Sequence, residues 1–136
     1  MAENYPEAAW KHVTDSEALL NVKRYDGAGY LAGYAVECTL KTLIQVENTR
    51  RVRVHNLDRL SNEVLRLISL PAQRTARYVT NPNITSLQFG SGGWRETIRY
   101  EAGGFVSQAD SEAWVAEAKR LCDEIIIPMK LDGVIP

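Results

Sequence analysis

The sequence predicts an all-α protein, a four- to five-helix up-and-down bundle with a long glycine-rich loop before the last helix. Two observations predict this fold class. Most of the chain falls into segments with helical apolar spacing and capping residues, and the links between the first four segments are short. The chain has 136 residues, of which 45% are hydrophobic and 24% are charged. These values suit one globular core, so we expect a single domain over residues 1–136.

The first helix is expected over about residues 5–24. Asn4 is placed to cap it, and Pro6 suits its first turn. Thr14 and Glu17 form a second capping box, so this helix either continues through Thr14 or restarts there.

The second helix, over about residues 27–46, is expected to be the buried centre of the bundle. Its sequence, GAGYLAGYAVECTLKTLIQV, places apolar residues around almost the whole circumference. Gly29 and Gly33 lie four residues apart and leave a shallow strip on which another helix can pack closely. Because glycine costs a helix about 1 kcal/mol, we expect a packing reason for both.

Glu37 and Lys41 carry the only charges of this helix. Their i, i+4 spacing is the favourable order for an ion pair, and their apolar neighbours predict at least partial burial. Two interpretations remain open: the pair is an internal clamp, or it lines a dimer seam or a cleft.

The remaining helices are expected over about residues 56–69, 71–79 and 107–127. Ser107 is placed to cap the last of them, and Pro128 is expected to end or kink it.

The long loop is expected over residues 80–106, where several glycines alternate with aromatic and aliphatic residues. Loops of this length in a compact domain are usually functional, part of an interface, or disordered, and the aromatic content argues against disorder. We expect a short hairpin or helical turn near residues 94–100.

Charge is distributed unevenly along the chain. Residues 50–99 contain nine arginines, no lysine and three acidic residues, a net charge of +6, whereas the rest of the chain carries −7. This asymmetry favours an anionic partner for the middle of the chain, and arginine favours forked contacts to phosphate or carboxylate. Alternatively, these arginines pair with the acidic helices around them.

Six residues in this region are candidates for contacts to a nucleotide or RNA. Interleaved aromatic and guanidinium groups suit base stacking combined with phosphate contact. The alternative for the aromatic residues is that they fix the loop to the core. The candidates are Arg74, Arg77, Trp94, Arg95, Arg99 and Tyr100.

Cys38 and Cys122 lie in apolar stretches, which indicates small buried side chains in a reducing compartment. The two cysteines and two histidines show no metal-ligand spacing, and we expect no metal or cofactor. No signal peptide is visible, and the longest uncharged run, residues 27–36, is too short to cross a membrane. A cytoplasmic location is therefore expected.

Two stretches together resemble the HEPN domain family: RYDGAGYLAGYAVECTLKTLI (residues 24–44) and HNLDRL (residues 55–60). Trp94 followed by Arg99-Tyr100 before a last helix is also similar to that family, and the resemblance covers roughly residues 8–126. It implies an all-α bundle that commonly forms a homodimer. It also implies a partner nucleotidyltransferase in a toxin–antitoxin-like module or, in other relatives, metal-independent RNA cleavage.

In the RNA-cleaving relatives, the resemblance implies an arginine, four to six further residues and a histidine at a dimer interface. Arg50 and His55 have this spacing, and Arg51 is one residue short of it. They precede the third helix, whereas active relatives carry the motif near the start of a later helix. His55 would be the acid/base and Arg50 or Arg51 would stabilise the developing charge. Alternatively, His55 or Asn56 caps the third helix.

The resulting expectation is a non-catalytic HEPN-like module that contacts a nucleotide, RNA or a partner nucleotidyltransferase. A metal-independent ribonuclease and a protein–protein adaptor are the alternatives.

Overall fold

The computed structural model describes residues 4–48, 53–79 and 94–136, and this part of the chain contains helices and no strand. The elements in chain order are α1 (Tyr5–Asn21), α2 (Tyr25–Asn48), α3 (Leu57–Ile68), the short η1 (Ala76–Tyr78) and η2 (Glu96–Tyr100), α4 (Gln108–Leu121), η3 (Cys122–Ile126) and α5 (Ile127–Leu131). The predicted all-α fold class is confirmed.

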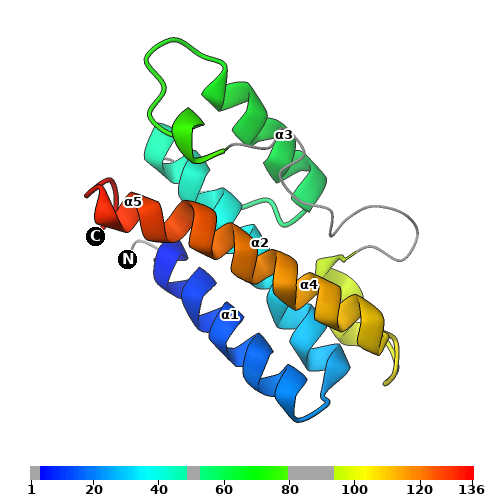
Figure 1. The fold of residues 1–136 in the computed structure, drawn as a ribbon. Coiled ribbons are helices and arrows are strands. Elements are labelled where there is room, and N and C mark those ends of the chain that lie inside the picture. The colour runs from blue at the N-terminus through cyan, green and yellow to red at the C-terminus, as the bar shows by residue number, and fades with distance from the viewer. Residues whose placement is uncertain (1–3, 49–52, 80–93) are drawn as a thin grey trace.

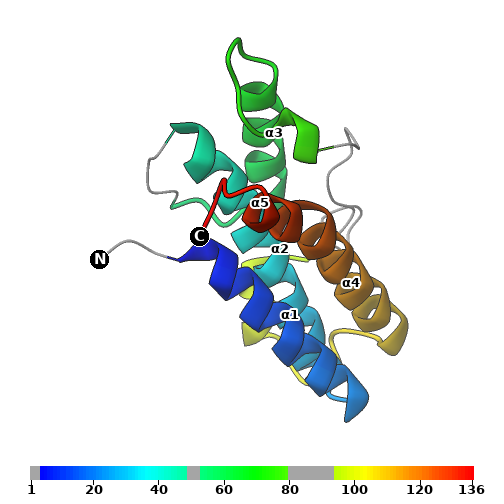
Figure 2. The same ribbon diagram turned by 60° about the vertical axis from the view of Figure 1, so that its left-hand side comes forward.

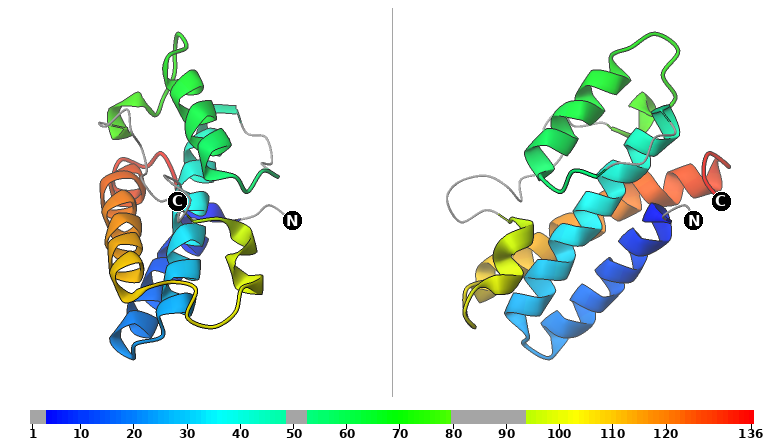
Figure 3. Two further views of the ribbon diagram at one scale, coloured as in Figure 1. Left: turned by 90° about the vertical axis from the view of Figure 1, so that its right-hand side faces the viewer. Right: turned by 180° about the vertical axis from the view of Figure 1, so that it is seen from behind.

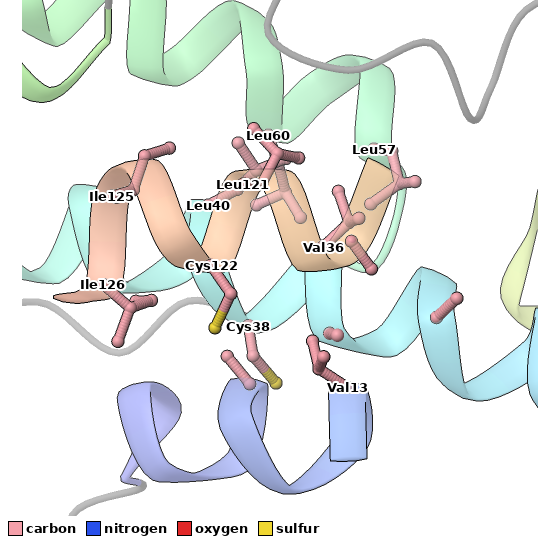
Figure 4. Packing of buried hydrophobic residues seen from close by; sticks show 14 of the residues in the cluster. Val13, Val36, Cys38, Leu40, Leu57, Leu60, Leu121, Cys122, Ile125 and Ile126 are labelled. Atoms are coloured by element: carbon pink, nitrogen blue, oxygen red, sulfur yellow. The ribbon is translucent and has the colours of Figure 1, made fainter. Parts of the chain in front are cut away.

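Helix α2 is the centre of the fold. It pairs with α1 through a tight turn, and α4 packs against both of them, while α3 covers the C-terminal half of α2 (Figures 1 and 2). The core is built around α2 by side chains from α1, α3, α4 and η3. Figure 4 shows Val13 of α1, Leu60 of α3, Leu121 of α4 and Ile126 of η3 within this cluster. Helix α2 therefore has buried residues along most of its length, as its apolar circumference predicts.

Helix ends follow the capping residues of the sequence. The side-chain oxygens of Asn4, Asn56 and Ser107 accept hydrogen bonds from the backbone N–H three residues on, at 3.3, 3.1 and 3.0 Å. Asn56 therefore caps α3. Helix α1 continues through Thr14, whose hydroxyl donates to the carbonyl oxygen of Trp10 at 3.0 Å.

The expected boundaries need correction at several points. Lys23 has a φ of 63°, so α1 stops at Asn21 and α2 begins already at Tyr25. Over residues 71–79 the structure has turns and only the short η1 instead of a helix, since Ala72 also adopts a positive φ, 61°.

Pro128 does not end the last helix. A wide turn, η3, precedes it, and the helix then continues as α5 to Leu131. Proline lacks an N–H and its ring clashes with the carbonyl of the preceding turn, and widening that turn relieves both problems.

The two glycines of α2 are in contact with large side chains. A β-carbon at Gly29 would lie 2.8 Å from Val106 Cγ1 and 3.0 Å from Trp114 Cε3. One at Gly33 would lie 1.9 Å from Trp94 Cε2. The strip expected from the sequence is thus occupied by Trp114 of α4 and by Trp94.

No helix in the described ranges is long and apolar enough to span a bilayer.

Candidate functional site

One face of α2 carries four residues with polar tips. Tyr30, Tyr34, Glu37 and Lys41 are spaced by four, three and four positions, which places them along one side of a helix. Side chains from α1, from the connection before α3 and from the segment around η2 meet this face. Three of the candidate functional residues, His55, Trp94 and Arg99, contact this face.

The C-terminal half of this face holds the buried ion pair. Lys41 Nζ lies 3.0 Å from Glu37 Oε2, and the two residues are 4% and 3% exposed. His55 Nδ1 lies 2.9 Å from the same oxygen, although its side chain is 51% exposed. The pair is therefore an internal clamp that also holds the connection leading into α3.

Glu37 is not fully satisfied by these contacts. Its Oε1 is buried and has no hydrogen-bond partner among the described residues. A buried carboxylate in this state depends strongly on the two cationic or donor groups that it does have. Arg50 and Arg51, the candidate partners of His55, lie outside the described residues.

The N-terminal half of the face is aromatic. The rings of Tyr30 and Tyr34 stack with their centroids 4.9 Å apart, and Trp94 meets Tyr34 edge-on at 5.4 Å. Trp94 is only 4% exposed, and its Nε1 donates to the carbonyl oxygen of Tyr30 at 3.1 Å. Its indole is thus unavailable for base stacking. Trp94 instead fixes the segment before η2 to α2, so we remove it from the candidate contacts. Figure 3 shows that η2 lies beside α2.

Arg99 projects from η2 beside these rings. Its Nη1 donates to the Tyr30 hydroxyl oxygen at 3.2 Å and its Nη2 to that of Tyr100 at 2.8 Å. The guanidinium also lies 4.9 Å from the centroid of the Tyr100 ring, a cation–π contact. Hydrogen bonding to Tyr30, then to Tyr100, raises the pKa of Arg99, so it remains cationic. No carboxylate in the described ranges pairs with it.

A pocket opens between Arg99 and helix α1. Its volume is about 480 Å³. It is lined by His12, Gly27, Tyr30, Leu31, Tyr34 and Arg99. None of these residues is acidic. The lining combines two phenols, an imidazole and one cation on the rim.

His12 and Tyr34 titrate abnormally in this setting. Burial, followed by the nearby charge of Lys11, lowers the pKa of His12, while Asp15 and Glu37 act in the opposite direction. Burial, and then the neighbouring Tyr30 hydroxyl, raises the pKa of Tyr34. Near pH 7 the imidazole is therefore neutral and the phenol protonated, and both offer hydrogen bonds without charge.

The other candidate arginines do not join Arg99. Arg77 lies 3.3 Å from Asp132 and donates to Tyr78, which fixes η1 to the end of α5. Arg74 donates through its backbone N–H to Glu47, about 25 Å along α2 from Tyr30. The six expected contact residues thus occupy two separate regions.

Arg95 lies beside Arg99 in sequence but already has a partner. Its Nη2 is 3.2 Å from Glu101 Oε1, and its guanidinium lies 5.2 Å from the Phe105 ring centroid. The interpretation that these arginines pair with acidic residues is therefore confirmed for Arg77 and Arg95, whereas Arg99 has no acidic partner within the described residues.

Tyr30 and Tyr34 were not predicted from the sequence as residues of the candidate site, and His12 was given no role. The tyrosines had a readable signal, since they continue the spacing of Glu37 and Lys41 along one helical face. His12 had none, because only the packing of α1 against α2 brings it to Tyr34, at a ring-centroid distance of 6.0 Å.

Within the described ranges, no group of three or more histidine, cysteine, aspartate or glutamate side chains is placed to hold a metal ion.

Comparison with known proteins gives one match. No curated protein and no solved structure matches the chain. The HEPN domain model matches residues 2–127, nearly the whole chain. HEPN domains are nucleotide- or RNA-related modules in general, and they often dimerise. The extent of this match, together with the all-helical fold, shows that the chain belongs to the HEPN domain family.

Proposed function

We propose that this HEPN domain is a non-catalytic binding module that contacts RNA or a nucleotide through Arg99 and the aromatic residues around it. The observation that carries the proposal is the position of Arg99, held by the hydroxyls of Tyr30 and Tyr100 and paired with no described carboxylate. A guanidinium held in this way retains N–H groups for a phosphate, and the hydrogen bonds reduce the entropy lost on binding.

Tyr100 supports the same proposal. It is 74% exposed, unusual for a large aromatic side chain, and its ring already lies against a cation. An exposed ring beside a guanidinium can stack on an unpaired base while the arginine contacts the adjoining phosphate.

The proposal includes a setting that the family resemblance implies. The module forms a homodimer and works beside a partner nucleotidyltransferase in a toxin–antitoxin-like system. The buried, free cysteines suit the reducing cytoplasm. An adaptor that binds only the partner protein remains the competing role, and RNA titration separates it from the proposed one.

The test is a titration with single-stranded RNA at low and moderate salt. Arg99→Ala should lower the affinity about tenfold and reduce the salt dependence by the contribution of about one phosphate contact. Arg66→Ala is the matched control, because it removes another exposed arginine, one that already pairs with Glu63 on α3. Absence of RNA binding at low salt, or an equal loss in both variants, would reject the proposal and favour the adaptor.

A metal-independent ribonuclease is a second candidate, favoured by the contact between His55 and Glu37. A buried carboxylate on Nδ1 orients the ring, and half of the side chain remains open to solvent. An imidazole held in this way suits a general acid/base role. The proposal gives Arg50 or Arg51 the role of stabilising the developing phosphorane charge. RNA cleavage in the presence of a chelator that disappears in His55→Ala would establish this role. Cleavage that persists in that variant would reject it.

A further inference from the structure

We propose that the pocket between α1 and α2 holds the base of a single unpaired nucleotide, with its phosphate on Arg99 and its polar edge against His12. This inference rests on the proposed function and narrows it. The ligand is one nucleotide unit, either free or part of an RNA strand, and the pocket provides the specificity that Arg99 alone lacks.

The size and lining of the pocket carry the first step. A volume of about 480 Å³ falls in the range of small-molecule sites, roughly 300–1,000 Å³. Tyr30 and Tyr34 present a stacked pair of rings, and Leu31 adds apolar surface. A flat aromatic group is the ligand component that such a surface accommodates best.

The charge of the lining carries the second step. Among the described residues that line the pocket, Arg99 alone is charged, and it lies at the rim with its guanidinium fixed by Tyr30. A cationic ligand would be repelled there, whereas an anionic group attached to an aromatic ring would be held at both ends. A nucleotide has this composition.

His12 carries the third step. Its Nδ1 is buried without a hydrogen-bond partner among the described residues, at a polar site beside Tyr34. The charged or titratable groups that act on it are Lys11 and Asp15 on α1 and Glu37 on α2. Because Nδ1 is buried, Nε2 is the nitrogen left to meet a ligand. In a neutral imidazole Nε2 is either a donor or an acceptor, and it can therefore favour one base edge over another.

The experiment is calorimetric titration of the full chain with the four ribonucleoside 5′-monophosphates, with ribose 5-phosphate and with a single-stranded RNA of about ten nucleotides. The best nucleotide should bind at least about tenfold more tightly than ribose 5-phosphate, because only the nucleotide places a ring in the pocket. His12→Phe keeps a ring but removes both nitrogens. It should weaken that nucleotide about fivefold and change the order of the four bases.

Leu31→Trp fills the pocket from within and should abolish the difference between nucleotide and ribose 5-phosphate. Leu70→Trp is its matched control, since Leu70 is 43% exposed and does not line the pocket, and it should leave all affinities unchanged. A thermal unfolding transition measured for each variant tests whether that variant is folded. If Leu31→Trp does not fold, His12→Phe alone decides.

The outcomes separate this inference from the proposed function. Free nucleotides that do not bind, with RNA weakened by His12→Phe and Leu31→Trp, would place the nucleotide within an RNA strand and support the inference. RNA binding that depends on Arg99 but is unchanged in both pocket variants would overturn it and leave the proposed function intact. Equal affinities for nucleotide and ribose 5-phosphate, together with that unchanged RNA binding, would overturn it too. Absence of binding to every probe would overturn both.

Discussion

Trp94 lies directly over Gly33 of α2, so close that a β-carbon on Gly33 would come within 1.9 Å of Trp94 Cε2 and 2.0 Å of its Nε1. The absence of a side chain at Gly33 therefore lets the indole reach the helix backbone and donate to the Tyr30 carbonyl. Arg99 follows Trp94 by five residues. The position of the candidate binding surface depends on this glycine.

Gly33→Ala should displace Trp94 and lower the free energy of unfolding by about 3 kcal/mol, a typical cost for losing a well-packed aromatic contact. Urea denaturation measures the change. Gly103→Ala is the control, because nothing lies within 4 Å of a β-carbon at Gly103. Equal stability of the two variants would contradict the tight contact.

The ion pair of α2 predicts a strongly non-additive pair of substitutions. Glu37→Leu leaves the buried Lys41 ammonium without its carboxylate, so we expect a loss of about 3–5 kcal/mol of unfolding free energy. Adding Lys41→Met removes the unpaired charge and should recover a large part of that loss. A double variant as unstable as the sum of the single ones would show that the two charges act independently.

The lowered pKa of His12 predicts how stability changes with pH. Because burial makes the folded state take up a proton less readily than the unfolded state, the unfolded state binds more protons below about pH 6.5. Stability should therefore be level above that pH and fall as the pH drops from 6.5 towards the lowered pKa of the folded state. His12→Gln should fall less steeply over that interval in urea denaturation. Parallel curves for the two proteins would contradict a partly buried, neutral His12.

The burial of both cysteines predicts that their thiols react slowly in the folded protein. Burial raises the pKa of Cys122 to about 11, and Cys38 is buried on α2. Neither should form a reactive thiolate in the native protein. Ellman's reagent at pH 8 should thus react slowly with the folded chain. In urea, where both thiols are exposed, it should react rapidly with both. Rapid labelling of either native thiol would mean that the core opens readily at that site.

The sequence predicted more of the backbone than of the surroundings of individual side chains. The fold class and the three helix starts capped by Asn4, Asn56 and Ser107 were predictable, because apolar spacing and capping act over a few neighbouring residues. The helix expected over residues 71–79 was wrong. Ala72 adopts a left-handed conformation that alanine rarely takes, and nothing in the local sequence indicates it.

The candidate site was predicted in part. The spacing of Glu37 and Lys41 was enough to predict their pair, since both side chains project from the same face of α2. Arg99 and Tyr100 remain in the proposed surface. The burial of Trp94 and the ion pair of Arg77 with Asp132 involve partners from distant parts of the chain.

The sequence by itself thus determined the helical class, the capped helix starts and the charge pair within α2, all of which depend on interactions between near neighbours. Only the tertiary structure decided that Trp94 belongs to the core, that Arg99 has no acidic partner among the described residues, and that His12 lines the same pocket as Tyr34. The physical reason is that burial, ion pairing and pKa depend on what surrounds a side chain. For these residues the surroundings come from elements that are far apart in sequence and meet only when α1 and η2 pack on α2.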